Sequence, residues 1–303
     1  MSRASPAAGG GGDRRLVLLL VATISVFWGF NWPAMKVGVG ELGPWLFRTI
    51  TVGVAGACLL AAARLGGERI RLAVADLRSL LPVSLFAVTG WHLFTAFGLT
   101  YIGGGRAVIV AFTMPLWAAI TSSLWLGERH GARLIAALFL GLVGIGVLMG
   151  PDIGRLVDQT TGSLLVLGAS VCWAIGTVGT KARRWSVGAT ALAGWQLLLG
   201  WVPILLATLL FDPLPDLSGL TLRGILATAY ASTVALALCY GAFIKIVTMV
   251  PASVAAISTL AIPVIGVSSS ALLLGEPLGF RELAALALIL PALALVLLPR
   301  RGG

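Results

Sequence analysis

Long apolar stretches alternate with short polar ones along almost the whole chain. A helix needs about 20 apolar residues to cross the hydrocarbon core of a bilayer, and we expect ten such helices. The expected spans are residues 16–39, 44–64, 78–101, 104–126, 131–149, 161–181, 188–210, 222–246, 251–274 and 279–298. Continuous apolar runs are unlike the short alternating segments of a membrane β-barrel. The pattern therefore predicts an all-α integral membrane protein.

Composition and charge agree with a membrane protein. Of the 303 residues, 58% are hydrophobic and 11% are charged, which is more apolar than a soluble domain of this size needs. The net charge of +10 comes from basic residues in short loops, where such residues set membrane orientation, so we expect no nucleic-acid partner. Most Lys and Arg residues fall on the side of the N-terminus, which predicts that both termini are cytoplasmic.

One block of sequence occurs twice. Residues 114–140 read MPLWAAITSSLWLGERHGARLIAALFL, and residues 262–288 read IPVIGVSSSALLLGEPLGFRELAALAL. A shift of 148 places Pro115 on Pro263 and Glu128 on Glu276. Internal repeats of this kind are typical of secondary transporters.

The repeat covers both halves of the chain. Trp28 precedes Lys36 by eight residues, and Trp173 precedes Lys181 by the same interval. Each half then contains five spans, and because five is odd the second half must enter the membrane from the opposite side. We expect two inverted five-helix repeats around a central cavity. The expected organisation is a disordered tail (1–13), a first repeat (14–150), a linker (151–160), a second repeat (161–299) and a basic tail (300–303).

These features carry a family resemblance. Ten spans arranged five plus five, the segment FWGFNWPAMKVG, and the two prolines each followed twelve residues later by Gly-Glu resemble the drug/metabolite transporter superfamily, in its EamA-type branch. The resemblance implies a bacterial inner-membrane exporter of amino acids or other metabolites. It also implies a cavity lined by spans 1, 3, 4, 6, 8 and 9, with spans 5 and 10 behind.

Acidic residues are absent from the predicted middle of the membrane. All 11 Asp and Glu residues fall in tails, loops or span ends. An exporter of lipophilic cations needs a counter-charge, and membrane carboxylates commonly relay protons. The sequence therefore argues against antiport of a cationic drug with protons.

The candidate substrate-binding residues are polar and aromatic side chains on the predicted spans, most of them near the membrane centre and Arg48 about one turn inside the outer end of its span. They are Trp28, Asn31, Arg48, Trp91, His92, Thr95, Trp117, Trp173 and Tyr230. Histidine is costly in lipid and titrates near neutral pH, while a central tryptophan needs a partner for its indole N–H. Packing between helices is the competing interpretation for the aromatic residues, and hydroxyl groups can bond their own helix backbone.

Two further groups of residues complete the expected machinery. Lys36, Arg48 and Arg106 could attract an anion at the outer mouth, although long basic side chains near helix ends also reach the headgroups. Pro115 and Pro263 each remove a backbone donor near the centre of a span, and we interpret them as hinges for alternating access or as fixed kinks.

The sequence therefore favours a secondary transporter that exports a small polar metabolite, with an amino acid or derivative as the expected substrate. The alternatives are a carrier for an organic anion and a non-transporting membrane scaffold or sensor. We expect no enzymatic activity, no cofactor and no metal; only two histidines, His92 and His130, are present. The expected partners are the substrate and the lipid bilayer. Proton coupling and the choice between monomer and homodimer stay open.

Overall fold

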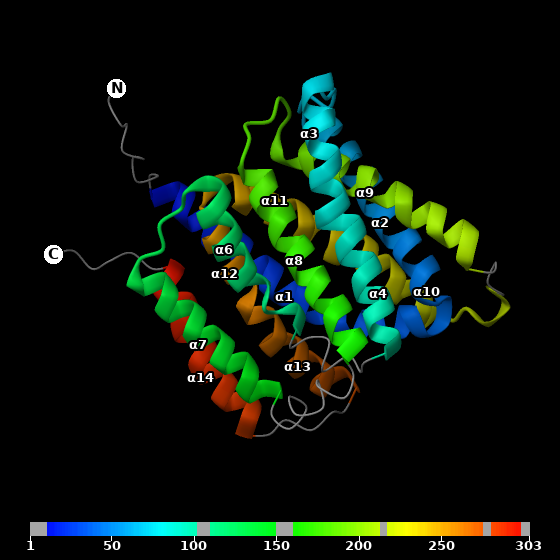
Figure 1. The fold of residues 1–303 in the computed structure, drawn as a ribbon. Coiled ribbons are helices and arrows are strands. Elements are labelled where there is room, and N and C mark those ends of the chain that lie inside the picture. The colour runs from blue at the N-terminus through cyan, green and yellow to red at the C-terminus, as the bar shows by residue number, and fades with distance from the viewer. Residues whose placement is uncertain (1–10, 102–109, 150–159, 213–216, 275–279, 298–303) are drawn as a thin grey trace.

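The computed structural model describes residues 11–101, 110–149, 160–212, 217–274 and 280–297. Within these ranges the regular structure is helical and contains no strand. Figure 1 shows a bundle of helices. The predicted C-terminal tail and most of the predicted linker and N-terminal tail lie outside the described residues.

The first half of the chain forms a run of helices joined by short connections. They are α1 (Gly11–Leu42), α2 (Pro44–Leu65), α3 (Val74–Ser84), the π-helix η1 (Leu85–Gly90), α4 (Trp91–Tyr101), α6 (Met114–Leu126) and α7 (Ala132–Met149). No break separates α3, η1 and α4, so they form one long helical segment.

The second half has a similar order of elements. They are α8 (Thr160–Lys181), α9 (Ala189–Phe211), the 3₁₀ turn η3 (Leu217–Gly219), α10 (Leu222–Tyr230), the π-helix η4 (Ala231–Leu238), α11 (Cys239–Met249), α12 (Ala252–Ile257), the 3₁₀ turn η5 (Ser258–Leu260), α13 (Ala261–Leu274) and α14 (Phe280–Leu297). Here α10, η4 and α11 are continuous, as are α12, η5 and α13.

Six helical segments are long and apolar enough to cross a membrane. They are Asp13–Leu42, Pro44–Leu65, Val74–Thr95, Thr160–Lys181, Ala189–Phe211 and Leu222–Met249. Met114–Leu126, Ala132–Gly144 and Ala252–Gly266 are shorter apolar helices. The chain is thus an all-helical, multi-pass membrane protein. The count of ten spans and their inverted arrangement stay predictions.

Corresponding elements of the two halves recur at a nearly constant interval. Helix α4 begins at residue 91 and α11 at residue 239. This interval is the 148 residues found in the sequence repeat. The π-helices keep the same relation, because η1 ends at Gly90 and η4 at Leu238. A π-helix adds one residue to a turn, and here each lies in the middle of a long apolar segment.

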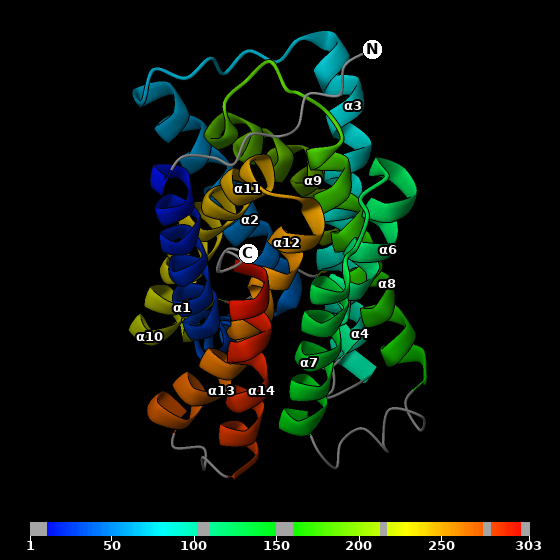
Figure 2. The same ribbon diagram turned by 90° about the vertical axis from the view of Figure 1, so that its left-hand side faces the viewer.

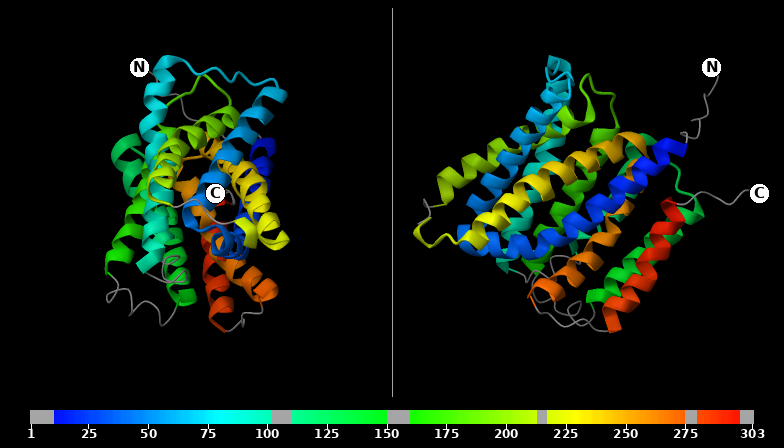
Figure 3. Two further views of the ribbon diagram at one scale, coloured as in Figure 1. Left: turned by 90° about the vertical axis from the view of Figure 1, so that its right-hand side faces the viewer. Right: turned by 180° about the vertical axis from the view of Figure 1, so that it is seen from behind.

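Two layers can be distinguished in the bundle. Helices α7 and α14 pack closely against each other and lie side by side at one edge (Figures 1 and 2). The remaining long helices surround the centre: α2 packs on α9, and α8 packs on α4, η1 and α6. Figure 3 shows α1 alongside the helix that runs through α10 to α11, and these elements are in contact.

The two predicted hinge prolines lie where helices are interrupted. Residues 112–113 form a turn, and α6 begins at Met114 with Pro115 in its first turn. In the second half the 3₁₀ turn at 258–260 precedes α13, whose third residue is Pro263. Proline is well tolerated at the start of a helix because its missing N–H has no intrahelical partner there. At the other end of α6, Gly127 adopts a left-handed conformation (φ 65°) and terminates the helix.

Glycine permits the closest approach between the helices. A Cβ atom added to Gly176 of α8 would lie 2.4 Å from the Cβ atom of Ala87 and 2.7 Å from its Cα atom. These are backbone-level contacts, so no side-chain rotation can relieve them. Gly168, two turns earlier on α8, offers a Cβ atom 3.4 Å from the ring of Phe94, which is ordinary contact.

We predict that Gly176→Ala destabilises the protein and that Gly168→Ala does not. Overpacking of this kind costs about 1–3 kcal/mol because α8 must move away from η1. Thermal unfolding of the purified protein in nanodiscs, followed by tryptophan fluorescence, measures the difference. Equal melting temperatures for the two variants would contradict the packing described for Gly176.

Candidate functional site

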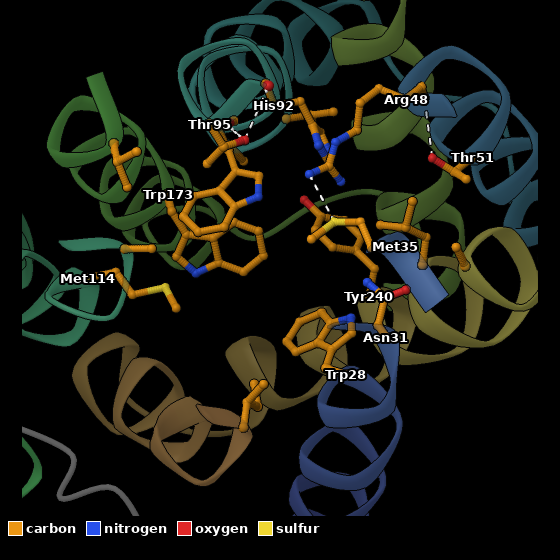
Figure 4. Close-up of a pocket in the computed structure, with 18 of the residues that line it drawn as sticks. Trp28, Asn31, Met35, Arg48, Thr51, His92, Thr95, Met114, Trp173 and Tyr240 are labelled. Carbon is orange, nitrogen blue, oxygen red and sulfur yellow. Dashed lines mark hydrogen bonds between the residues drawn. The ribbon is translucent and has the colours of Figure 1, made fainter. Parts of the chain in front are cut away.

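A cavity lies among α1, α2, α4, α8 and the segment from α10 to α11 (Figure 4). Its walls are mainly apolar, with a few polar side chains that converge on the interior. The lining residues are Trp28, Asn31, Met35, Phe47, Arg48, Thr51, Ala87, Val88, Trp91, His92, Thr95, Ala111, Phe112, Met114, Val166, Trp173, Ala231, Leu236, Tyr240 and Ile262. An apolar cavity with a few convergent polar groups is the usual form of a small-molecule site.

Most of the candidate residues identified in the sequence line this cavity. They are Trp28, Asn31, Arg48, Trp91, His92, Thr95 and Trp173. Trp117 does not line it; this side chain packs beside a cluster that contains Ala118 and Ala256, and its indole N–H donates to Thr113. Tyr230 lines a separate groove on α1 and α10, and its hydroxyl donates to the carbonyl of Phe27.

Arg48 carries the single positive charge among the described lining residues. Helix α2 begins at Pro44, so Arg48 enters the cavity from the first turns of that helix, as Figure 4 shows. Its Nη2 atom lies 3.4 Å from the sulfur of Met35. No carboxylate of the described residues pairs with it. A guanidinium is costly in a membrane unless it is paired or hydrated, so Arg48 is available to a ligand.

Three buried polar atoms of residues that line the same cavity as Arg48 have no hydrogen-bond partner in the described structure. They are Oδ1 of Asn31, Nδ1 of His92 and Nε1 of Trp173. The side chains of His92 and Trp173 are only 5% and 8% exposed. Leaving such atoms unpaired costs about 1–3 kcal/mol each. Together they offer a donor from the indole, an acceptor from the amide and an imidazole nitrogen whose role depends on its tautomer.

Aromatic rings form the apolar wall of the cavity. The ring centroid of Trp173 lies 5.2 Å from that of Trp91, 5.2 Å from that of Phe243 and 6.1 Å from those of Trp28 and Tyr240. These separations are in the range of favourable aromatic pairs. Trp173 therefore stands at the centre of a cluster that joins both halves of the chain.

Not every polar side chain in the cavity is available to a ligand. The indole N–H of Trp28 donates to the carbonyl of Ala235 in η4. The hydroxyl of Thr95 donates to the carbonyl of Trp91, 2.7 Å away, and that of Thr51 donates to the carbonyl of Phe47. These groups already donate to backbone carbonyls, so they contribute mainly to the shape of the cavity.

The cavity has a volume of about 140 Å³. An apolar cavity of about 150 Å³ in another protein accommodates one benzene molecule. In the conformation described, the site therefore has room for a group about as large as one ring.

Some lining residues are not among the candidates chosen from the sequence, although the repeat points to them. Tyr240 lies 148 residues after His92, and Ile262 lies 148 residues after Met114; all four line the cavity. Applying the repeat interval to each candidate would have found Tyr240. Met35 gives no such signal, because methionine in an apolar helix is typical of packing.

Two further cations, Lys36 and Arg106, are proposed with Arg48 for anion binding. Arg106 lies outside the described residues, and only the backbone of Lys36 is described. No group of three or more His, Cys, Asp or Glu side chains within the described ranges is arranged to hold a metal ion.

Comparisons with known proteins agree with the fold and the repeat interval. The sequence pattern of the EamA-like transporter family matches residues 15–150 and again residues 160–298. The uncharacterized transporter YvbV of Bacillus subtilis is 30% identical over 92% of this chain and 90% of its own length. A protein of Salmonella typhimurium named as a probable amino-acid metabolite efflux pump is 28% identical over 90% of this chain and 92% of its own.

A membrane location and the fold have further support. The uncharacterized inner membrane transporter YedA of Escherichia coli is 28% identical over 90% of this chain and 88% of its own. A solved crystal structure aligns with a TM-score of 0.78 at 20% identity, over 92% of this chain and 95% of that one. The two matches of the family pattern together cover most of the chain, which therefore belongs to the EamA-like transporter family.

Proposed function

We propose that the protein is a secondary transporter that exports an amino acid or amino-acid derivative through the cavity around Arg48. The observation that carries this proposal is the coexistence of one unpaired guanidinium and three unpaired buried polar atoms within a single apolar cavity. Groups that destabilise the empty protein are expected where a substrate completes their hydrogen bonds. The name of the Salmonella typhimurium relative, a probable amino-acid metabolite efflux pump, supports the same substrate class.

Each part of an amino acid has a chemical counterpart in the cavity. A guanidinium binds a carboxylate through two parallel hydrogen bonds, which suits Arg48. An ammonium group needs acceptors, and Oδ1 of Asn31 and the imidazole of His92 can supply them. The rings of Trp91 and Trp173 would pack against the side chain, and a tryptophan face also attracts a cation. The ammonium thus needs no carboxylate partner.

Transport would proceed by alternating access between two inverted halves. The constant interval between corresponding helices and the two matches of the family pattern support a repeat. The interruptions at Pro115 and Pro263 support a change of helix direction at these two points. We propose that both termini face the cytoplasm, since most basic residues lie on that side.

The second candidate function is carriage of an organic anion. The unpaired charge of Arg48 would favour it, because no acidic side chain lines the described cavity. The two functions differ in what they require of the substrate's amino group. An N-acetylated amino acid keeps the carboxylate and loses the ammonium, whereas an amino-acid amide loses the carboxylate.

We predict that Arg48→Gln abolishes transport of neutral amino acids by proteoliposomes that contain the purified protein. Losing a charge-assisted pair lowers kcat/KM by about 100-fold. Tyr230→Phe is the control, because this side chain lies outside the cavity and should retain normal rates. Transport of N-acetylated amino acids in preference to free ones would support the anion carrier. Normal amino-acid transport by Arg48→Gln would exclude the proposed role of Arg48.

A second prediction separates a functional charge from a structural one. Arg48→Met removes a cation that has no carboxylate partner, so we expect an unchanged or higher melting temperature. Arg183→Met breaks the ion pair in which Nη2 of Arg183 lies 2.9 Å from Oδ1 of Asp76, a side chain only 5% exposed. We expect that variant to lose about 1 kcal/mol. Thermal unfolding of both variants tests this; a clear loss of stability in Arg48→Met would assign Arg48 a structural role instead.

A further inference from the structure

Acidic side chains of the first half bind the second half at four places. Each carboxylate accepts hydrogen bonds across the two halves, and three of the four accept one from a backbone N–H and one from a side-chain hydroxyl. The pairs are Glu41 with N and Oγ1 of Thr221 (2.9 and 2.8 Å), Glu68 with N of Ala191 and Oγ1 of Thr190 (3.1 and 2.7 Å), and Glu128 with N of Ala252 and Oγ of Ser253 (3.0 and 2.8 Å). In the fourth, Asp76 accepts from N of Ser186 (2.9 Å) and pairs with Arg183.

Three of these contacts lie at the same end of the bundle. Glu68 follows the end of α2, Asp76 lies in the first turn of α3, and Glu128 follows the end of α6. Their partners lie between α8 and α9, at the start of α9, and at the start of α12. Figure 1 shows the connection after α2 and the connection after α8 at the same end. Glu41, at the end of α1, makes its contact at the opposite end.

The cavity lies away from this end. Arg48 is the fifth residue of α2, which continues to Leu65, so about 25 Å of helix separates it from the level of Glu68. The side chains between them are tightly packed. Gly176 touches Ala87, and the buried amide of Gln196 donates to Thr180, 3.0 Å away. At the end where the three carboxylates lie, the described structure is therefore closed.

We propose that Glu68, Asp76 and Glu128 form a gate that closes one end of the transport path, which we infer to be the cytoplasmic end. This inference rests on the alternating access proposed above. Hydrogen bonds from N–H and hydroxyl groups to a carboxylate are stronger than those between neutral groups, and a helix start favours a negative charge. The carboxylates hold the two halves together without contacting substrate. Opening this end requires them to separate from the second half.

Distances between spin labels in nanodiscs test the gate without any substrate. The labels are attached at Arg129→Cys and Lys245→Cys, two exposed positions near the gate in different halves, after Cys58, Cys172 and Cys239 are replaced by alanine. We expect E68A/E128A to add a longer distance and to raise the ratio of open to closed molecules by at least about tenfold, since two charge-assisted contacts are lost. An unchanged distance distribution would overturn the proposal.

The matched control is Glu41→Ala, which removes the same kind of contact at the opposite end. It should leave the distance between the labels unchanged; an equal lengthening would mean general loosening and would also overturn the gate. If E68A/E128A does not fold, E68Q/E128Q replaces it. Hydrogen exchange at the amides of Ala191 and Ala252 then reports the gate, with faster exchange expected and unchanged protection contradicting it. Because no substrate is present, a response of the labels with no transport of amino acids would reject the proposed substrate and keep the gate.

Discussion

Hydrocarbon offers no hydrogen-bond partner, so polar groups within the membrane must find one inside the protein. This constraint accounts for the helical architecture and for the way the chain uses its hydroxyl groups. The hydroxyl groups of Thr95 and Thr51 donate to backbone carbonyls of their own helices. The carbonyl of Ala235 in η4 accepts from Trp28, and Thr89 in η1 donates to the carbonyl of Gly200. Against this background, the three unpaired polar atoms of the residues that line the cavity differ from the other polar groups of these helices, because they lie where a ligand could supply the missing hydrogen bonds.

Much of the helical pattern could be predicted from hydropathy, because apolar length and short polar loops are direct consequences of bilayer thickness. The observed bounds of α2 and α9 differ from the expected spans by at most one residue at either end. The hydropathy pattern does not predict the π-helices, because the residues from Leu85 to Gly90 are equally compatible with an α-helix and with a π-helix. The hydropathy pattern does not predict the 3₁₀ turn at 258–260 either.

The sequence predicts how deep in the membrane a residue lies, but it predicts less well which face of a helix is turned toward the cavity. Residues near the middle of their spans, such as Trp28 and Trp173, line the cavity. On span 4, Thr113, Trp117 and Thr121 recur every four residues and suggest a face toward the cavity. In the structure Trp117 instead packs beside the cluster of Ala118 and Ala256 and donates to Thr113. The contacts of Glu68 and Glu128 with the second half could not be predicted, because one partner of each is a backbone N–H group, which nearly every residue offers, and the other is a hydroxyl more than 100 residues away in the sequence.

The two halves are alike in fold but not in charge. Arg48 is the fifth residue of α2, whereas the fifth residue of α9 is the buried Ala193. A cavity with exact two-fold symmetry would bind a dipolar molecule equally well in either of two opposite orientations. With one cation displaced toward the start of α2, a dipolar substrate bound as proposed would keep its negative end toward one membrane face. It would have to be released from Arg48 before leaving the cavity, and this asymmetry would fix the order in which its two ends meet water.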